Sequence, residues 1–182
     1  MLDPTPLLHE WDNFYLTTGA AAGAIIGLQF VVMTLIADRP PRRPGEAGAA
    51  YSTPTVFHFA VVLFLSVLLA APWGSIAIPS LIWGAIGLFG IGYALVVAQR
   101  IRSLADYKPV ADDWLCNIVV LLVAYAGLTA SAVLVRSDIS DALYAVGTSA
   151  LVLLFTGIRN SWDLVGFHVS VSGTRPKARK DQ

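Results

Sequence analysis

The chain has 182 residues, of which 56% are hydrophobic and 13% are charged, and its formal net charge is zero. Soluble domains carry about 25% charged residues, which they need to cover their surface. Together with a mean hydropathy of +0.68, this composition argues against a soluble enzyme, a nucleic-acid-binding protein and a disordered protein. It indicates an integral membrane protein.

Four long intervals without a charged residue divide the chain, and they contain 25, 53, 22 and 17 residues. A membrane-spanning helix needs about 20 apolar residues, so three of these intervals fit one span each. The second interval would form a helix of roughly 80 Å, far longer than the bilayer, and must fold back. The residues Pro-Trp-Gly-Ser at 72–75 favour a turn, so the chain is expected to fold back there. The sequence therefore predicts an all-α polytopic transmembrane bundle in a single domain, 1–182, with five spans at about 14–37, 55–71, 78–98, 114–135 and 142–158.

The first predicted span carries a GxxxGxxxG pattern at Gly19, Gly23 and Gly27. Residues four apart share one helical face, and glycines there let another helix backbone come close, which drives association in lipid. We expect this face to pack against a helix of the same chain or of a second copy. Thr18 and Gln29 lie about 20° apart around the same helix. They form a polar stripe, and Gln29 is on the opposite side from Gly27.

The next segments of the chain also contain polar residues and small residues. The loop at 38–54 is rich in Pro, Gly and Arg, which predicts a cytoplasmic segment with little regular structure. The second span contains His58 near its start. A lone histidine is more often a structural hydrogen-bond partner than a ligand, and haem would normally want a second axial ligand. No metal site and no cofactor are therefore expected. The third span repeats the small residues of the first, at Gly84, Gly87, Gly90 and Gly92.

The last two spans also contain small residues at spacings suited to close packing: Ala124, Gly127, Ser131, Ala145 and Ser149. Ser140 or Asp141 can cap the start of the fifth span. The segment 164–173 is ambiguous, because apolar residues at 167, 169 and 171 alternate as in a strand, whereas those at 164, 167 and 171 share a helical face. We expect a helix to about Val165, followed by a strand-like end.

The basic residues lie almost entirely on one side of the predicted membrane topology. Eleven of the twelve fall in the first loop, the third loop and the C-terminal segment, and only Arg136 falls on the other side. Because positive residues stay in the cytoplasm, the N-terminus is predicted outside and the C-terminus inside, in a bacterial inner membrane. The tail is either an ordinary cytoplasmic tail or a site for anionic lipid headgroups. Its basic residues are Arg175, Lys177, Arg179 and Lys180.

No Asp, Glu, Lys or Arg lies inside any predicted span, and His58 is the only candidate there for an ionisable coupling group. Coupled transporters usually keep an ionisable group in the membrane, so active transport is disfavoured. The residues of a predicted polar cluster, most of them in the cytoplasmic half, are Thr18, Gln29, His58, Asn117, Thr156, Asn160 and Asp163. Unpaired amides are costly in hydrocarbon. Two interpretations remain open: a buried hydrogen-bonded network that ties helices together, and a polar-lined cavity or pore.

Two stretches, TGAAAGAIIGLQFVVMTLIADRP at 18–40 and GIRNSWDLVGFHV at 157–169, resemble a type found in small bacterial inner-membrane proteins of unknown function. The resemblance covers about a fifth of the chain. It implies a multi-span bacterial membrane protein and brings no reaction, ligand or catalytic residue. It marks a set of residues for testing: Gly23, Gly27, Gln29, Arg159, Asn160, Trp162 and Asp163.

No hydrolase, zinc-protease or nucleotide-binding motif occurs in the sequence, so no catalytic residue is predicted and an enzyme is not expected. The leading hypothesis is a homo-oligomeric membrane protein, channel-like or pore-like, with a polar cytoplasmic half. The alternative is a non-conducting accessory or scaffold protein that docks a cytoplasmic partner through its loops and basic tail. The expected partners are membrane lipid, further copies of the chain and, in the alternative, that cytoplasmic protein; nucleic acid is not expected.

Overall fold

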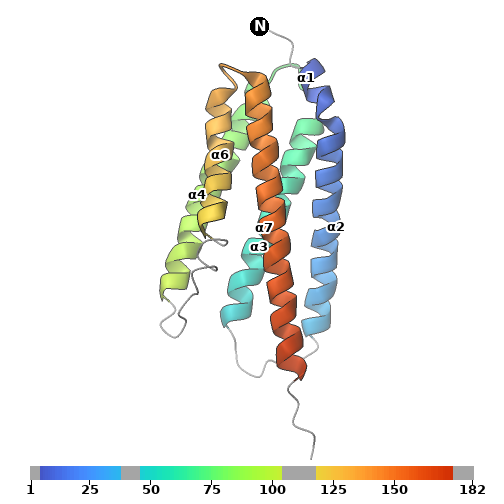
Figure 1. Ribbon diagram of the computed structural model, residues 1–182, viewed down its shortest axis with the longest axis vertical. Helices are drawn as coiled ribbons and strands as arrows, with labels where there is room; N and C mark the ends of the chain where they lie inside the picture. The colour runs from blue at the N-terminus through green and yellow to red at the C-terminus, as the bar shows by residue number, and fades with distance from the viewer. Residues whose placement is uncertain (1–4, 38–45, 104–117, 174–182) are drawn as a thin grey trace, which may run out of the picture.

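The computed structural model describes residues 5–37, 46–103 and 118–173, and it is drawn in Figure 1. These residues form the helices α1 (Thr5–Glu10), α2 (Asp12–Ala37), α3 (Glu46–Ala70), α4 (Ala77–Ser103), α6 (Val120–Leu134) and α7 (Ile139–Gly173). No strand occurs among the described residues, and the predicted all-α class is confirmed there.

Three helical segments are long and apolar enough to cross a membrane: Asp12–Thr34, Ala77–Gln99 and Ile139–Asp163. They coincide with the first, third and fifth predicted spans. The second and fourth predicted spans correspond to shorter apolar helices at Thr55–Ala70 and Val120–Leu134. The exposed surface of all five segments carries large apolar side chains, such as Phe30, Val67, Leu88, Val123 and Phe155. Soluble monomers rarely expose apolar patches of this extent, whereas a helix in lipid needs them.

The expectation of little regular structure at 38–54 is wrong for its second part, because α3 begins at Glu46. Glu46 is followed by an alanine-rich run, and alanine is the strongest helix former. A glutamate in the first turn also suits the positive end of the helix dipole. Residues 38–45 lie outside the described part of the chain. The helix that contains the third predicted span continues beyond it, since α4 ends at Ser103.

The predicted strand-like end after Val165 is also wrong, because α7 continues as one helix to Gly173. No proline interrupts the sequence between Ile139 and Gly173. A continuing helix satisfies its backbone hydrogen bonds internally, whereas a lone strand would leave an unpaired edge. The helix ends at a glycine, the residue most common just after a helical C-terminus.

The cap of α7 also differs from the expectation. The backbone N–H of Asp141 donates to Oδ1 of Asp138 at 3.0 Å. Asp138 is therefore the N-cap, and Ser140 and Asp141 lie inside the first turn. The sequence assignment failed because it placed the start of this helix at residue 142.

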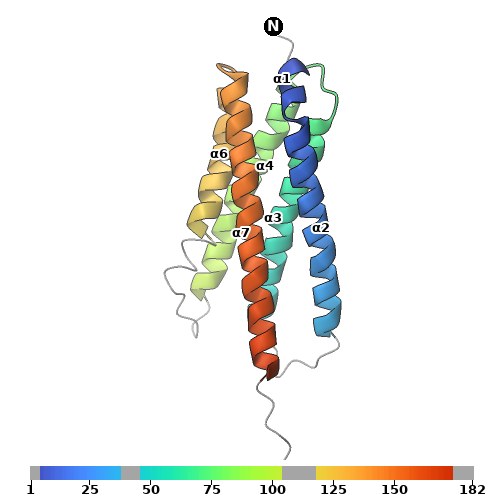
Figure 2. The ribbon, with the colours of Figure 1, turned by 45° about the vertical axis from the view of Figure 1, so that its right-hand side comes forward.

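The helices pack side by side along one long axis (Figures 1 and 2). The most extensive contacts join α2 to α3, α4 to α6 and α6 to α7, and α7 also packs along α3. The contact between α3 and α4 is much smaller. We call the end that holds α1, the 71–76 connection and the 135–138 turn the α1 end. The opposite end is the one at which α7 extends furthest in Figure 1.

Candidate functional site

Polar side chains join the helices in three separate pairs, not in one cluster. The first pair lies between α2 and α3. Oγ1 of Thr18 is 3.2 Å from Oγ of Ser66 and also lies 2.9 Å from the carbonyl oxygen of Phe14. The neighbouring Gly19 packs against the same serine, since a Cβ at Gly19 would lie 2.8 Å from Cβ of Ser66. A small residue is therefore required where the two helices meet.

The second pair lies between α3 and α6. Nδ1 of His58 is 2.7 Å from the hydroxyl oxygen of Tyr125, and both side chains are buried. Among the described residues, Nε2 of His58 has no hydrogen-bond partner. The ring of Tyr125 also lies against Gly90, so this tyrosine connects α3, α4 and α6. Tyr125 is not among the residues predicted from the sequence. The signal available was a tyrosine in an apolar span, because a buried tyrosine hydroxyl usually has a partner.

The third pair lies between α2 and α7. Nε2 of Gln29 donates to Oγ of Ser161. The hydroxyl of Ser161 donates in turn to the carbonyl oxygen of Gly157 at 2.8 Å. Gly157 lies against the ring of Phe59, from which a Cβ would be 2.7 Å away. Asn160 is among the residues predicted from the sequence, whereas its neighbour Ser161 is not. Only the rotation of α7, which sequence does not supply, decides which of the two faces Gln29.

The remaining predicted cluster residues do not join these pairs. Thr156 is buried, and its hydroxyl donates to the carbonyl oxygen of Val152 in its own helix at 2.7 Å. Asn160 is half-buried, and Asp163 is exposed. Nε of Arg159 lies 3.9 Å from Oδ2 of Asp163, an exposed pair of the kind that contributes about 0.5 kcal/mol or less. Some of the predicted positions lie outside the described residues: Asn117, Arg175, Lys177, Arg179 and Lys180.

The glycines divide into packed and open positions. A Cβ at Gly84 would lie 2.7 Å from Cβ of Ala132, and one at Gly87 would lie 2.8 Å from the carbonyl oxygen of Tyr125. The α4 and α6 backbones therefore approach closely along these positions. By contrast, Gly23 and Gly27 have no atom within 4 Å of a Cβ built on them. Of the predicted α2 stripe, only Gly19 packs within the described bundle, and the other two glycines lie toward its outer surface.

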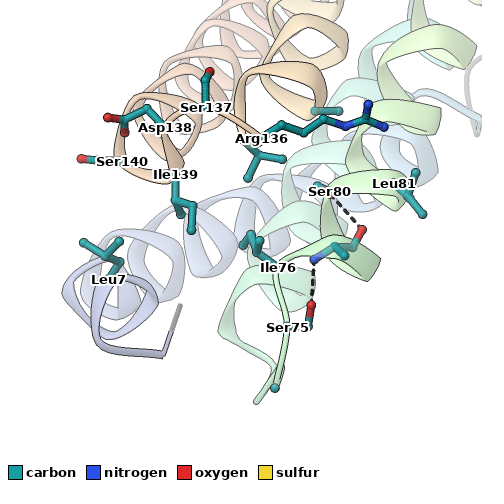
Figure 3. Close-up of a pocket in the computed structure, with 14 residues that line it drawn as sticks. Leu7, Ser75, Ile76, Ser80, Leu81, Arg136, Ser137, Asp138, Ile139 and Ser140 are labelled. Atoms are coloured by element: carbon teal, nitrogen blue, oxygen red, sulfur yellow. Dashed lines mark hydrogen bonds between the residues drawn. The ribbon is translucent and has the colours of Figure 1, made fainter. Parts of the chain in front are cut away.

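A cavity of about 960 Å³ lies at the α1 end, where the first turn of α4 faces the turn between α6 and α7 (Figure 3). We call it the α1-end cavity. Its lining includes Arg136 and Asp138 together with apolar residues such as Leu7 and Ile139. The sequence analysis missed it. The available signal was Arg136, the one basic residue placed on this side of the membrane, though its neighbours across the cavity depend on the packing.

No group of three or more His, Cys, Asp or Glu side chains that could hold a metal ion occurs in 5–37, 46–103 or 118–173. In comparisons with protein families, with curated proteins and with solved structures, nothing matched this chain. The function therefore has to be argued from the geometry of the bundle itself.

Proposed function

We propose that the chain is a five-span protein of a bacterial inner membrane, with the α1 end outside and the C-terminus in the cytoplasm. The apolar outer surface of the helices supports the membrane assignment. The charges support the orientation. The α1 end carries Arg136 with Glu10, Asp12, Asp138 and Asp141, whereas eleven basic residues lie in the segments assigned to the cytoplasm.

We further propose that the protein forms a homo-oligomer through the outer face of α2. Ala20, Ala24 and Gly27 are exposed on this face, and Gly23 lies at its edge. Small residues at this spacing let a second helix approach closely, and close packing is the main source of helix association in lipid.

Within this assembly, the proposed role is that of a non-conducting accessory protein that docks a cytoplasmic partner. The observation that carries this choice is that Thr18, His58 and Gln29 are each used in a pair inside one subunit. The exposed faces left to line a path between subunits are mostly apolar. The competing proposal is a channel-like oligomer, which would need a hydrated path along such faces.

The cytoplasmic end of α7 supplies a surface for docking. The helix has 35 residues, which at 1.5 Å per residue give about 52 Å, compared with about 30 Å for a bilayer core. Roughly 20 Å of helix therefore extends beyond the hydrocarbon. The first turns of this extension present Trp162, with 77% of its surface exposed, beside the charged side chains of Arg159 and Asp163. Exposed tryptophan and arginine are frequent energetic anchors of protein interfaces.

Ion and small-solute flux through proteoliposomes distinguishes the two roles. Purified protein is expected to give no flux above that of empty liposomes. A flux that Gln29→Leu reduces would establish the channel-like alternative and overturn the accessory role.

Site-specific photo-crosslinking in cells tests docking directly. A photo-reactive residue at Trp162 is expected to give a defined adduct with a second protein. Phe155 is the matched control, because it is exposed on the same face of α7 two turns nearer the α1 end. Identical adducts at both positions, or none at Trp162, would contradict docking at the end of α7.

Self-association has its own test, the mass of the detergent-solubilised particle. Gly27→Leu is expected to shift an oligomer toward the monomer. Gly92→Leu on α4 is the control, since both glycines have open space around them and neither substitution should disturb the bundle. A wild-type monomer, or equal behaviour of the two variants, would count against an interface on α2.

A further inference from the structure

The α1-end cavity presents two opposite charges that are not paired with each other. Arg136 and Asp138 both line it, from the turn between α6 and α7. Figure 3 shows the Arg136 side chain extending toward the first turn of α4, near Ser80 and Leu81, while the Asp138 carboxylate lies on the other side of the turn. Among the described residues, neither side chain forms an ion pair.

Apart from the hydroxyl of Ser140, the other groups around the cavity are apolar or already hydrogen-bonded. Leu7, Ile76 and Ile139 contribute apolar surface. The hydroxyl of Ser80 donates to the carbonyl oxygen of Ala77 at 2.8 Å, as drawn in Figure 3. The hydroxyl of Ser137 donates to the carbonyl oxygen of Leu134 at 2.9 Å. The two charges are therefore the main groups left to recognise a ligand. The volume of about 960 Å³ lies within the range of small-molecule sites, roughly 300–1,000 Å³.

The two charged side chains are suited to opposite ends of a zwitterion. The guanidinium of Arg136 offers a planar fork of N–H donors that matches a phosphate. The carboxylate of Asp138 is held in place by the N–H of Asp141, which uses only part of its acceptor capacity. It can still accept hydrogen bonds from an ammonium group.

We propose that the α1-end cavity binds the headgroup of a zwitterionic phospholipid of the phosphoethanolamine type, with its phosphate on Arg136 and its ammonium on Asp138. The cavity lies at one end of the apolar bundle, at the level of lipid headgroups. Leu81, exposed on the adjoining turn of α4, offers an apolar path for the acyl chains. This inference requires only that the bundle lies in a membrane, and it does not depend on the docking role or on self-association.

The chemistry of the site predicts a definite order among lipids. A phosphocholine headgroup has no N–H to donate to Asp138. A phosphoglycerol headgroup has no ammonium, so its hydroxyl groups offer Asp138 only neutral hydrogen-bond donors instead of a charge-assisted one. Both should bind more weakly than phosphatidylethanolamine of the same acyl chains.

Native mass spectrometry of the delipidated, full-length protein with these three lipids measures the order. Phosphatidylethanolamine is expected to be retained best, and Arg136→Gln and Asp138→Asn are each expected to weaken its binding about tenfold. Asn caps a helix about as well as Asp, so Asp138→Asn removes the charge while the start of α7 is kept. Arg136→Lys keeps the positive charge but loses the planar fork, so it should weaken binding less than Arg136→Gln does. Arg159→Gln and Asp163→Asn remove the exposed pair nearer the far end of α7 and should change nothing.

Circular dichroism establishes that each variant is folded. Equal retention of all three lipids, or no loss in Asp138→Asn, would overturn recognition of a zwitterion. An equal loss in the Arg159→Gln control would overturn the assignment to this cavity. A final competition experiment adds free phosphoethanolamine to the lipid-bound protein. If it displaces the bound lipid at equal concentration, the site takes a soluble ligand instead of a phospholipid.

Discussion

Tyr125 is the residue on which three helices meet. Its hydroxyl contacts His58 of α3, and its ring lies on Gly90 of α4. A larger residue at position 90 would occupy the space of the ring. The contact therefore depends on Gly90 and Tyr125 together. Neither the glycine spacing in α4 nor the tyrosine in α6 predicts it alone.

Gly87, one turn from Gly90, provides a sharp test of this packing. Its added Cβ would lie 2.8 Å from both the backbone N of Thr129 and the carbonyl oxygen of Tyr125, and backbone atoms cannot move aside cheaply. Gly87→Ala is expected to lower stability by about 1–3 kcal/mol, as overpacking does. Gly92→Ala on the same helix meets no atom within 4 Å and should not destabilise. Thermal unfolding in detergent compares the two, and equal melting temperatures would contradict the close approach of α4 and α6.

At the scale of residues, the sequence identified several buried polar groups but not their partners. Thr18, Gln29 and His58 are buried, as their cost in hydrocarbon requires. Their partners Ser66, Ser161 and Tyr125 depend on how each helix is rotated about its axis. That rotation is set by packing between helices distant in sequence, which one chain's hydropathy pattern does not contain.

At the scale of elements, the positions of the apolar helices were predictable and their ends were not. The intervals without a charged residue predicted the first, third and fifth spans, because uncharged stretches of this length are rare outside membranes. These three spans lie within helices long enough to cross a membrane. The ends at Glu46, Ser103 and Gly173 lie beyond the apolar segments. Hydropathy does not report where a helix ends once its apolar segment is over.

The continuation of α7 can be tested with a proline. Val169→Pro is expected to destabilise the helix by about 3 kcal/mol, since it removes one backbone hydrogen bond and clashes with the preceding turn. Hydrogen–deuterium exchange should then show faster exchange of the amides between residues 160 and 168. Val169→Ala is the matched control and should preserve their protection. Equal protection in both variants would mean that this segment is not a continuous helix.

At the scale of the whole molecule, the zero net charge is the sum of a negative α1 end and a positive opposite end. This difference in charge between the ends predicts the orientation of the bundle in the membrane. Ser137→Cys at the α1 end and Asp163→Cys near the far end of α7 both introduce exposed thiols. With Cys116 replaced by Ala, a membrane-impermeant thiol reagent should label Cys at 137 in intact cells. It should label Cys at 163 only after the inner membrane is opened. The reverse pattern would overturn the proposed orientation.

The order of helix contacts has a consequence for synthesis. Helices α2 and α3 form one contacting pair and α4 and α6 another, but the contact between α3 and α4 is small. Helix α7, which follows these four helices in the chain, packs against α6, α3 and α2 and so joins the two hairpins. It also brings Ser161, the partner of Gln29. During translation the membrane is therefore expected to hold two loosely joined hairpins, with the Gln29 amide still unpaired, until α7 leaves the ribosome.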